Sequence, residues 1–438
     1  FYALHRNHLY FAPELKALAH LSTLPKTIDW TALASFLSAG YFLNGHTLLD
    51  AVRLLDNATV LQITPTGLTT QRYWHYTFEE GSKDRGRAYY QRTLADLLRT
   101  AVHRCLRTPH RYGLLLSGGY DSRALLGYAL AQPPAHPLHT ISWGASEDLP
   151  HSDCAIAARL ARRLALPHMF YPLRPHALPD HLRSFIALSD GLTDAVTNYP
   201  EALAIFHRIR HDLGLDILLR GDECFGWIAG AFDERTMFQT LGIHSLHDLK
   251  PYQSILTPAL RPVLEGHCTE LLHDVSSRCS AENIHNRKDF FYLDQRLQYY
   301  LHPLTYIKTL EVEVRTPYLD NDILDFVRTI PAKYRIEKNL FKHVVTESFP
   351  ALFDEIANST NLIDWNAELK KPYLKDFMYA LLVSKESCLP DFLDVEVLAS
   401  SLHAFYASRQ PAASHTGLMK TLKSMLVRSP SLYTLVQR

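Results

Sequence analysis

Paired cysteines and long apolar runs are both missing from this chain of 438 residues. Its six cysteines are scattered and form no C-x-x-C pair: Cys105, Cys154, Cys224, Cys268, Cys279 and Cys388. In a chain of this length, such spacing argues against a disulfide framework and favours reduced thiols in an intracellular, cytoplasmic protein. No apolar run approaches the roughly 20 residues that a membrane-spanning helix needs, and no signal peptide is visible. We therefore expect no membrane partner.

An excess of charge is also absent, because 45 Lys and Arg residues balance 45 Asp and Glu residues. No overall field favours nucleic acid, and we expect none as a partner. The 24 histidines show no H-E-x-x-H or comparable spacing, so we expect no zinc site. The Walker pattern G-x-x-x-x-G-K-[ST] is missing too. Any phosphate site must therefore be built in another way.

One glycine-bearing stretch offers such a site, Ser117-Gly118-Gly119-Tyr120-Asp121-Ser122. An apolar run leads into it and a helical pattern leads out. Two adjacent glycines permit a sharp turn that brings backbone N–H groups close to an anion. The N-terminus of the following helix adds unsatisfied donors and a favourable dipole. The serines can donate hydroxyls, and Asp121 supplies a hard oxygen for Mg²⁺. The alternative is a plain strand-to-helix turn without a ligand.

From residue 112 the sequence alternates short apolar runs with helical stretches. The predicted strands are Tyr112–Leu116, Leu138–Trp143, Met169–Leu173 and Asp216–Leu219. The predicted helices are Ser122–Leu130, Asp153–Leu166 and Pro200–Leu213. Apolar runs between helices indicate a parallel sheet covered on both faces, whose ligands bind at the carboxyl ends of the strands. Residues from about 235 to 438 are expected to be mostly helical.

The first 80 residues show a mixed α+β pattern. Strands are predicted at Leu9–Ala12 and Thr59–Ile63, and helices at Pro13–Leu18 and Asp29–Ala39. The charged, glycine-bearing residues 81–90 are predicted to be a linker. We therefore expect two domains, 1–80 and 91–438, joined by this linker.

The glycine-bearing stretch resembles the pyrophosphate loop (PP-loop) of the ATP-pyrophosphatase superfamily, whose fold is adenine nucleotide α hydrolase-like. Further motifs follow in the order typical of the asparagine synthetase family: Glu147 to Asp153, Arg220 to Gly226, Glu313 to Asp320, and Lys342 to Val345. Residues 1–80 resemble the closing third of that family's Ntn-type glutaminase domain, at Pro13–Leu18, Phe36–Tyr41 and Gly67–Trp74. Relatives of the family include β-lactam synthetases and lasso-peptide cyclases.

The resemblance implies an amide-forming ligase that uses ATP and Mg²⁺. A small-molecule or peptide carboxylate would be activated as an acyl-adenylate, with release of pyrophosphate, and an amine would then displace AMP. Ammonia from glutamine is the family's default nucleophile, as in an amidotransferase. That reaction uses an N-terminal cysteine, and this sequence has no cysteine before Cys105. The sequence leaves open an oligomer or a partner protein.

The resemblance also assigns candidate roles to residues of this chain. The nucleotide contacts are Leu116, Ser117, Gly118, Gly119, Asp121, Ser122, Ser142, Trp143 and Gly221; the metal ligands are Asp121 and Asp222; the catalytic candidates are Lys342, Asp222 and Arg335. Each has a structural alternative. Asp222 could cap a helix, Lys342 could be a solvated lysine, and Trp143 could belong to the core. The hypothesis requires Asp121, Asp222 and Lys342 to converge on one triphosphate.

Several positions depart from the family pattern, and most of them concern the acceptor. Arg123 stands where asparagine synthetases usually have serine, and Thr346 replaces an arginine. Leu304-Thr305 lies where many relatives carry Asp-Arg. The loop at Arg220–Glu223 is shorter and lacks the family's Glu or Tyr contact. Two alternatives to ammonia-dependent amidation therefore stay open: intramolecular amide formation, giving a lactam or macrolactam, and a degenerate nucleotide-binding scaffold without turnover.

Overall fold

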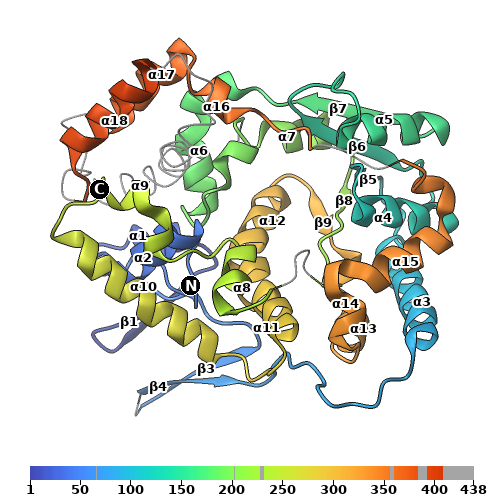
Figure 1. Cartoon of the computed structure of the whole chain (residues 1–438), viewed down its shortest axis with the longest axis horizontal. Helices are drawn as coiled ribbons and strands as arrows, with labels where there is room; N and C mark the ends of the chain where they lie inside the picture. The colour runs from blue at the N-terminus through green and yellow to red at the C-terminus, as the bar shows by residue number, and fades with distance from the viewer. Residues whose placement is uncertain (66, 202, 227–230, 356–359, 383–391, 408–438) are drawn as a thin grey trace.

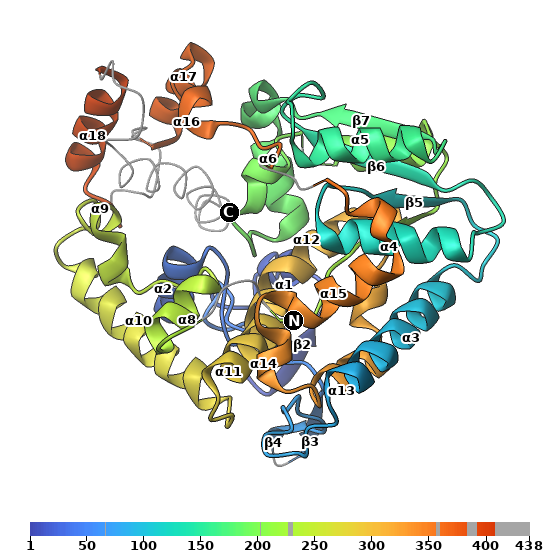
Figure 2. The same cartoon turned by 45° about the vertical axis from the view of Figure 1, so that its right-hand side comes forward.

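The computed structural model describes residues 1–438 apart from 66, 202, 227–230, 356–359, 383–391 and 408–438. Figure 1 shows two halves. The sheet half, on the right, holds the parallel sheet with helices α3, α4, α5, α13, α14 and α15. The helical half, on the left, combines the N-terminal segment with α8 to α12 and, at the top, α16 to α18. Figure 2, turned by 45°, keeps the same separation.

The sheet half is organised around five parallel strands in the order β7-β6-β5-β8-β9. Their bounds are β5 Tyr112–Leu115, β6 His139–Gly144, β7 His168–Pro172, β8 Ile217–Leu219 and β9 Glu313–Arg315. The chain leaves β5 toward β6 on one side, while β8 pairs with β5 on the other. Loops that diverge in this way open a crevice at the carboxyl ends of the strands.

Helices cover both faces of the sheet. Successive side chains of a strand point to opposite faces, so each strand contributes to two cores. Leu114, Ile217 and Leu219 pack in one core with α3 (Arg87–Cys105), α4 (Tyr120–Ala131) and α15 (Asn339–Ser348). Ile141 and Leu218 pack in another core with α7 (Ala204–His211). This double coverage explains why the strands lack the polar alternation of a half-exposed sheet.

The structure confirms the predicted parallel sheet, and element bounds shift by a few residues. The helix predicted to start at Ser122 is α4, which begins at Tyr120, so Asp121 and Ser122 lie in its first turn. The predicted helices 153–166 and 200–213 are α5 (Asp153–Arg163) and the shorter α7. Strand β9 was not predicted, because three residues after a helix are too few to show a strand pattern.

The N-terminal segment forms two separate antiparallel hairpins and two helices. These elements are β1 (Tyr2–His5), β2 (His8–Phe11), α1 (Leu15–Ala19), α2 (Trp30–Ala39), β3 (Thr59–Thr64) and β4 (Gly67–Arg72). The side chain of Asp29 caps α2 by accepting a hydrogen bond from Ala32 N at 2.9 Å. Helix α2 packs in a core shared with helices that lie between residues 178 and 407. Helix α3 begins at Arg87, inside the predicted linker 81–90.

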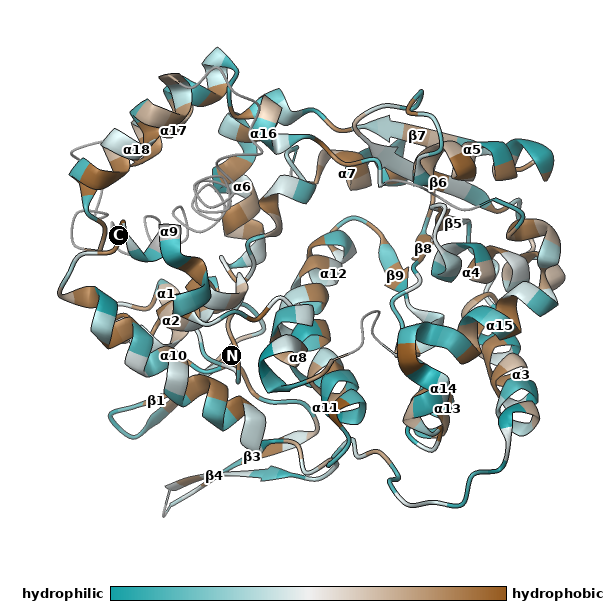
Figure 3. Cartoon of the chain, in the orientation of Figure 1, coloured by the Kyte–Doolittle hydropathy of each residue, from teal (hydrophilic) through white to brown (hydrophobic). Residues whose placement is uncertain are grey.

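The remaining described helices confirm a mostly helical C-terminal part. They are α6 Leu178–Ser189, α8 Glu234–Thr240, α9 Lys250–Gln253, α10 Leu260–Ser277, α11 Ile284–Phe291, α12 His302–Thr309, α13 Asn321–Val327, α14 Ala332–Arg335, α16 Trp365–Glu368, α17 Pro372–Leu382 and α18 Val395–Ala407. A π-helix, Tyr292–Leu301, joins α11 to α12. Helices of both halves carry hydrophobic and hydrophilic residues side by side (Figure 3). None of the described helices is long and apolar enough to span a bilayer.

Candidate active site

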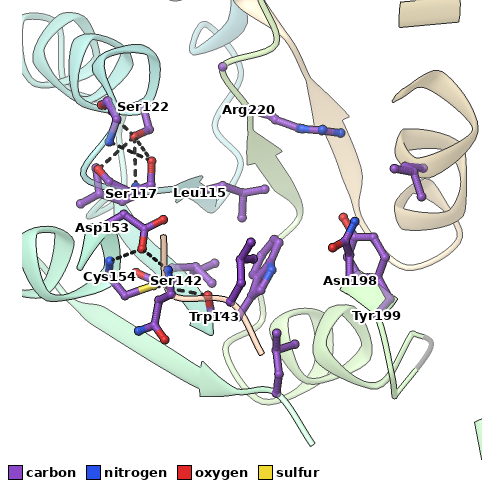
Figure 4. A pocket seen from close by; sticks show the side chains of 18 of the residues that line it. Leu115, Ser117, Ser122, Ser142, Trp143, Asp153, Cys154, Asn198, Tyr199 and Arg220 are labelled. Atoms are coloured by element: carbon purple, nitrogen blue, oxygen red, sulfur yellow. Dashed lines mark hydrogen bonds between the residues drawn. The ribbon is translucent and has the colours of Figure 1, made fainter. Parts of the chain in front are cut away.

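The loop after β5 is a compact turn held by two serines. The Ser122 hydroxyl accepts a hydrogen bond from Ser117 N at 3.0 Å and lies 2.9 Å from the Ser117 hydroxyl. Gly119 N donates to the Ser117 hydroxyl at 3.2 Å, and Figure 4 shows these serines at one end of a cavity. Gly119 is the N-cap of α4 and supplies no side-chain cap. The first N–H groups of a 12-residue helix are therefore directed at the cavity end of the turn.

The loop after β8 lies directly against this turn. A Cβ added to Gly221 would lie 3.2 Å from Asp121 Cβ, so the two loops touch and a side chain there would push them apart. Asp222 follows and pairs with Arg220, whose Nε lies 3.0 Å from Asp222 Oδ1. The Arg220 guanidinium also donates to the Thr305 hydroxyl at 2.8 Å. Asp121 and Asp222, from two neighbouring strands, therefore line one cavity.

A lysine that the sequence hypothesis did not single out contacts Asp121 and the neighbouring Glu223. Lys338 Nζ lies 2.9 Å from Asp121 Oδ2 and 3.1 Å from Glu223 Oε1. Lys338 and the preceding Glu337 both have left-handed backbone, with φ of 58° and 54°, immediately before α15. Burial disfavours its charged form, but the carboxylates of Glu223 and Asp121 more than compensate and raise the pKa of Lys338. The ammonium is thus fixed beside Asp121.

Glu223 is the buried member of this cluster. Its side chain is 4% exposed, and burial, opposed by Lys338, raises the pKa of the carboxyl to about 7. Its Oε2 accepts a hydrogen bond from Phe225 N. Its Oε1 is buried and lies 3.1 Å from Lys338 Nζ, so the lysine ammonium is the cation that this carboxyl meets.

The cavity has a volume of about 470 Å³ and two chemically different ends. The polar end is formed by the β5 and β8 loops with Ser142. The other end is largely apolar and is lined by Trp143, Tyr199, Tyr300, Leu301, Leu304, Leu362, Ile363 and Trp365. In Figure 4 the Arg220 side chain extends across the cavity toward Asn198 and Tyr199. Among the described lining residues, Arg220 is the one basic side chain.

Most of the residues named as nucleotide and metal candidates line this cavity, and their roles remain predictions. The candidates that line the cavity are Leu116, Ser117, Gly119, Asp121, Ser122, Ser142, Trp143, Gly221 and Asp222. Trp143 also packs edge-on against Phe206, with ring centroids 5.8 Å apart, so it serves the core as well. Gly118 lies within the turn and is not among the described lining residues.

The two basic candidates, Arg335 and Lys342, are not among the described residues that line the cavity. Arg335 is 2% exposed, and its guanidinium contacts Asp289, Asn286 and the Ile330 carbonyl. Its charge is therefore used inside the protein rather than at the cavity. Lys342 Nζ lies 5.5 Å from the Tyr120 ring centroid and does not line the cavity. Among the described ion pairs, the lysine that contacts Asp121 is Lys338. Lys338 has a left-handed backbone, and the amino-acid composition does not reveal such a conformation.

The departures from the family pattern are explained in part. Arg123 is 1% exposed and donates to the carbonyls of Leu352 and Glu355 at 2.9 and 2.8 Å. It thus anchors the chain behind α4 and faces away from the cavity. Glu313 and Arg315 form an ion pair with Nε and Oε1 2.6 Å apart, and the Glu313 side chain is half exposed.

Sequence comparison matches both parts of the chain to known families. Asparagine synthase matches residues 93–246 and 306–423, and a glutamine amidotransferase domain matches residues 1–74. Asparagine synthetase [glutamine-hydrolyzing] 3 of Bacillus subtilis (strain 168) is 21% identical over 397 residues, covering 81% of this chain and 61% of that protein. Asparagine synthetase [glutamine-hydrolyzing] 2 of the same organism is 28% identical over 183 residues, covering 38% of this chain and 24% of that protein. The chain thus spans less than two thirds of either relative.

Solved structures with distant similarity include two enzymes. An NMN synthetase from Francisella tularensis is 15% identical with a TM-score of 0.23, over 58% of this chain and 97% of that one. The U34-tRNA thiolase NcsA from Methanococcus maripaludis is 13% identical with a TM-score of 0.24, over 68% of this chain and 96% of that one.

The matched ranges omit residues 247–305, and this gap bears on the cavity. Tyr300, Leu301 and Leu304 all lie in the omitted segment and all line the apolar end. Tyr300 and Leu301 are the last two residues of the π-helix. This geometry is rare overall, but where it occurs it is often at a functional site. The loops of the polar end thus lie in the matched ranges, whereas three residues of the apolar end lie between them.

Proposed function

The chain belongs to the asparagine synthase family, and we propose that it is an ATP-dependent ligase that activates a carboxylate as an acyl-adenylate and converts it to an amide. One observation carries the proposal: Asp121 and Asp222 line one cavity beside the Ser-Gly-Gly turn, and Lys338 Nζ lies 2.9 Å from Asp121 Oδ2. A helix N-terminus, two carboxylates and one lysine are what an enzyme needs to hold a triphosphate and its metal ion.

The proposed reaction has two steps. A carboxylate oxygen of the substrate attacks the α-phosphorus of ATP, the bond from that phosphorus to the bridging oxygen breaks, and pyrophosphate leaves. An amine then attacks the acyl carbon, gives up a proton, and AMP leaves with the electrons of the acyl–oxygen bond. Most of the catalysis is alignment and charge neutralisation. The N–H groups at the start of α4 would bind phosphate oxygens, and the serine hydroxyls would fix the turn.

The donor set at the polar end fits the Mg²⁺ that accompanies ATP. Asp121 and Asp222 present hard carboxylate oxygens, which Mg²⁺ prefers, and both residues line the cavity. Asp121 and Asp222 would hold the ion, and its charge would offset that of the phosphates. Lys338 would add a further positive charge as pyrophosphate separates, in place of Lys342 and Arg335.

The apolar end of the cavity favours an acceptor other than free aspartate. An amino acid such as aspartate carries a second carboxylate that needs a cation or several donors once it is buried. The one basic lining side chain, Arg220, is already engaged by Asp222 and Thr305. Tyr300, Leu301 and Leu304 instead suit a carboxylate with apolar neighbours. This observation supports the second candidate function, in which an amine of the same peptide or small molecule attacks and closes a lactam or macrolactam.

Pyrophosphate release with defined acceptors tests these proposals. The purified protein is incubated with ATP and Mg²⁺ and with L-aspartate plus ammonium or glutamine, or with linear peptides that carry a free N-terminal amine and an internal Asp or Glu. Equal amounts of AMP and pyrophosphate would support adenylation, and loss of water from a peptide would support ring closure. ATP binding without release in any mixture, including one with hydroxylamine as nucleophile, would favour the non-catalytic scaffold instead.

A further inference from the structure

A cluster of three metal-binding side chains lies on the surface, outside the cavity. His207 and His211 project from α7, and Glu311 lies in the short link between α12 and β9. Histidines four residues apart share one face of a helix, and their ring centroids are 4.2 Å apart. His207 Nδ1 lies 3.4 Å and His211 Nε2 lies 3.9 Å from the same carboxylate oxygen, Glu311 Oε2. Two imidazoles therefore face one oxygen.

The spacing of these three atoms matches a small coordination sphere. A tetrahedral ion with bonds of about 2.0–2.1 Å to nitrogen and oxygen holds neighbouring ligand atoms about 3.3–3.4 Å apart. The two measured nitrogen–oxygen separations are 3.4 and 3.9 Å, and all three ligand atoms lie within 4.8 Å of one another. A fourth position would open to solvent, because both histidine side chains are 59% exposed.

The ligand types select the class of metal. Imidazole nitrogens suit Zn²⁺, Cu²⁺, Ni²⁺ and Co²⁺, whereas Mg²⁺ and Ca²⁺ prefer oxygen alone. Repulsion from the basic residues of α7 is limited, because Arg208 lies 3.7 Å from Asp212 and Arg210 pairs with Asp216. We propose that His207, His211 and Glu311 form a surface site for a divalent transition-metal ion, with Zn²⁺ the fitting representative. This revises the expectation of no zinc site, which overlooked the H-x-x-x-H spacing.

A metal ion at this site would join two elements that support the cavity. On α7, Phe206 packs against Trp143 and Tyr199, which both line the cavity. On α12, Leu304 lines the cavity and Lys308 Nζ lies 5.3 Å from the centre of the Tyr199 ring. An ion shared by α7 and the end of α12 would hold these side chains in register. The inference does not depend on the proposed ligase activity.

Metal titration of the full chain tests the site. The protein is stripped with a chelator and saturated with Mg²⁺, and Zn²⁺ binding is followed by calorimetry while Co²⁺ binding is followed by its visible d–d absorption. One tight site with a tetrahedral Co²⁺ spectrum and a raised melting temperature are expected. His207→Ala/His211→Ala should abolish that site, and Glu311→Gln should weaken it by about tenfold or more.

Matched controls separate this site from the other histidines and from the cavity carboxylates. His103→Ala/His273→Ala removes two exposed histidines from α3 and α10 and should leave the tight site intact. Asp121→Asn should also leave it intact. Equal Zn²⁺ affinity in the wild type and in His207→Ala/His211→Ala would overturn the proposal. A wild-type Zn²⁺ affinity no higher than that of isolated surface histidines would also overturn it. Glu311 would then form only an ion pair with protonated imidazole.

Discussion

The polar end of the cavity and its apolar end are built from different kinds of sequence. Asp121, Gly221 and Asp222 belong to tight loops directly after β5 and β8, so neighbouring strands bring them together. Tyr300, Leu301 and Leu304 come from a helical segment that the asparagine synthase match omits. Parallel strands fix the position of loop residues to within a residue or two, whereas a helical wall can change without disturbing the sheet. The chemistry and the choice of acceptor can therefore diverge separately.

The two halves also differ in how their cores form. One face of the sheet packs against α3, α4 and α15. The core of the helical half joins α2 to α6, α10, α12, α17 and α18. The N-terminal segment therefore shares its core with the rest of the chain, although the sequence suggested a separate domain for residues 1–80. Changes in the sheet half should chiefly affect turnover, and changes in the helical half should chiefly affect acceptor binding and stability.

Removing one of the two carboxylates proposed to bind Mg²⁺ should give the largest effect and would test the catalytic side of this comparison. Asp121→Asn and Asp222→Asn each keep the side-chain shape but lose the charge that would hold Mg²⁺. We expect pyrophosphate release, measured as kcat/KM, to fall by about 10³ in each variant. Asp96→Asn on α3, an exposed carboxylate paired with Arg99, is the control and should retain wild-type turnover. Activity of Asp121→Asn within threefold of wild type would refute the assignment.

Exchanging lysines should separate the structural assignment from the sequence assignment. Lys338→Arg keeps the buried charge beside Glu223 but spreads it over a planar group that cannot match the ammonium position. We expect kcat to fall by about 10² while the protein stays folded, as judged by its melting temperature. Lys342→Ala should change kcat by less than about threefold, because among the described ion pairs it is Lys338 that meets Asp121, whereas Lys342 Nζ lies 5.5 Å from the Tyr120 ring centroid. The opposite order of effects would restore Lys342 as the phosphate lysine.

The sequence predicted the sheet half well because its signals are local. The run Tyr112–Leu116, the two glycines and Asp121 lie close together in the sequence, so the strand fixes where the turn begins and the turn fixes where Asp121 lies. Lys338 escaped prediction because its position depends on two left-handed residues before α15, and non-glycine residues seldom show that preference in sequence. Arg335 was misplaced because its buried partners Asp289 and Asn286 lie far away in the chain. Contacts of long sequence separation have no local signature.

A pH series should distinguish the buried Glu223 from the exposed carboxylates. Its pKa is raised from 4.5 to about 7 in the folded protein, so folding is favoured while the carboxyl is protonated. That contribution is complete below the unfolded pKa and is lost as pH rises toward 7. Glu223→Gln should therefore gain stability relative to the wild type between pH 4.5 and 8, by at most about 3 kcal/mol. A constant difference in melting temperature across this range would contradict the assigned pKa.

Truncating the apolar wall should affect the acceptor and spare ATP. Tyr300→Ala removes an aromatic ring from the apolar end of the cavity. We expect the KM of a productive acceptor to rise by about tenfold, the cost of losing part of a hydrophobic contact, with the KM of ATP within twofold. Steady-state kinetics with each substrate varied in turn measures both values. A matched rise in the KM of ATP would mean that the two ends of the cavity are not separable.

Two glycine substitutions test the packing difference between the halves with the smallest expected effects. A Cβ at Gly127 in α4 would lie 2.5 Å from the Phe349 ring, which also meets Tyr128 edge-on, so there is no room for it. Gly127→Ala should therefore destabilise the protein by about 1–3 kcal/mol through overpacking. A Cβ at Gly266, on the exposed face of α10, meets nothing within 4 Å. Gly266→Ala should instead stabilise by about 0.5–1 kcal/mol, because alanine loses less backbone entropy in a helix.

Chemical unfolding of both variants gives the sign of each change in unfolding free energy directly. If Gly127→Ala were neutral, the Phe349 ring would be free to move, and the close packing behind the phosphate turn could not be what holds α4 in place.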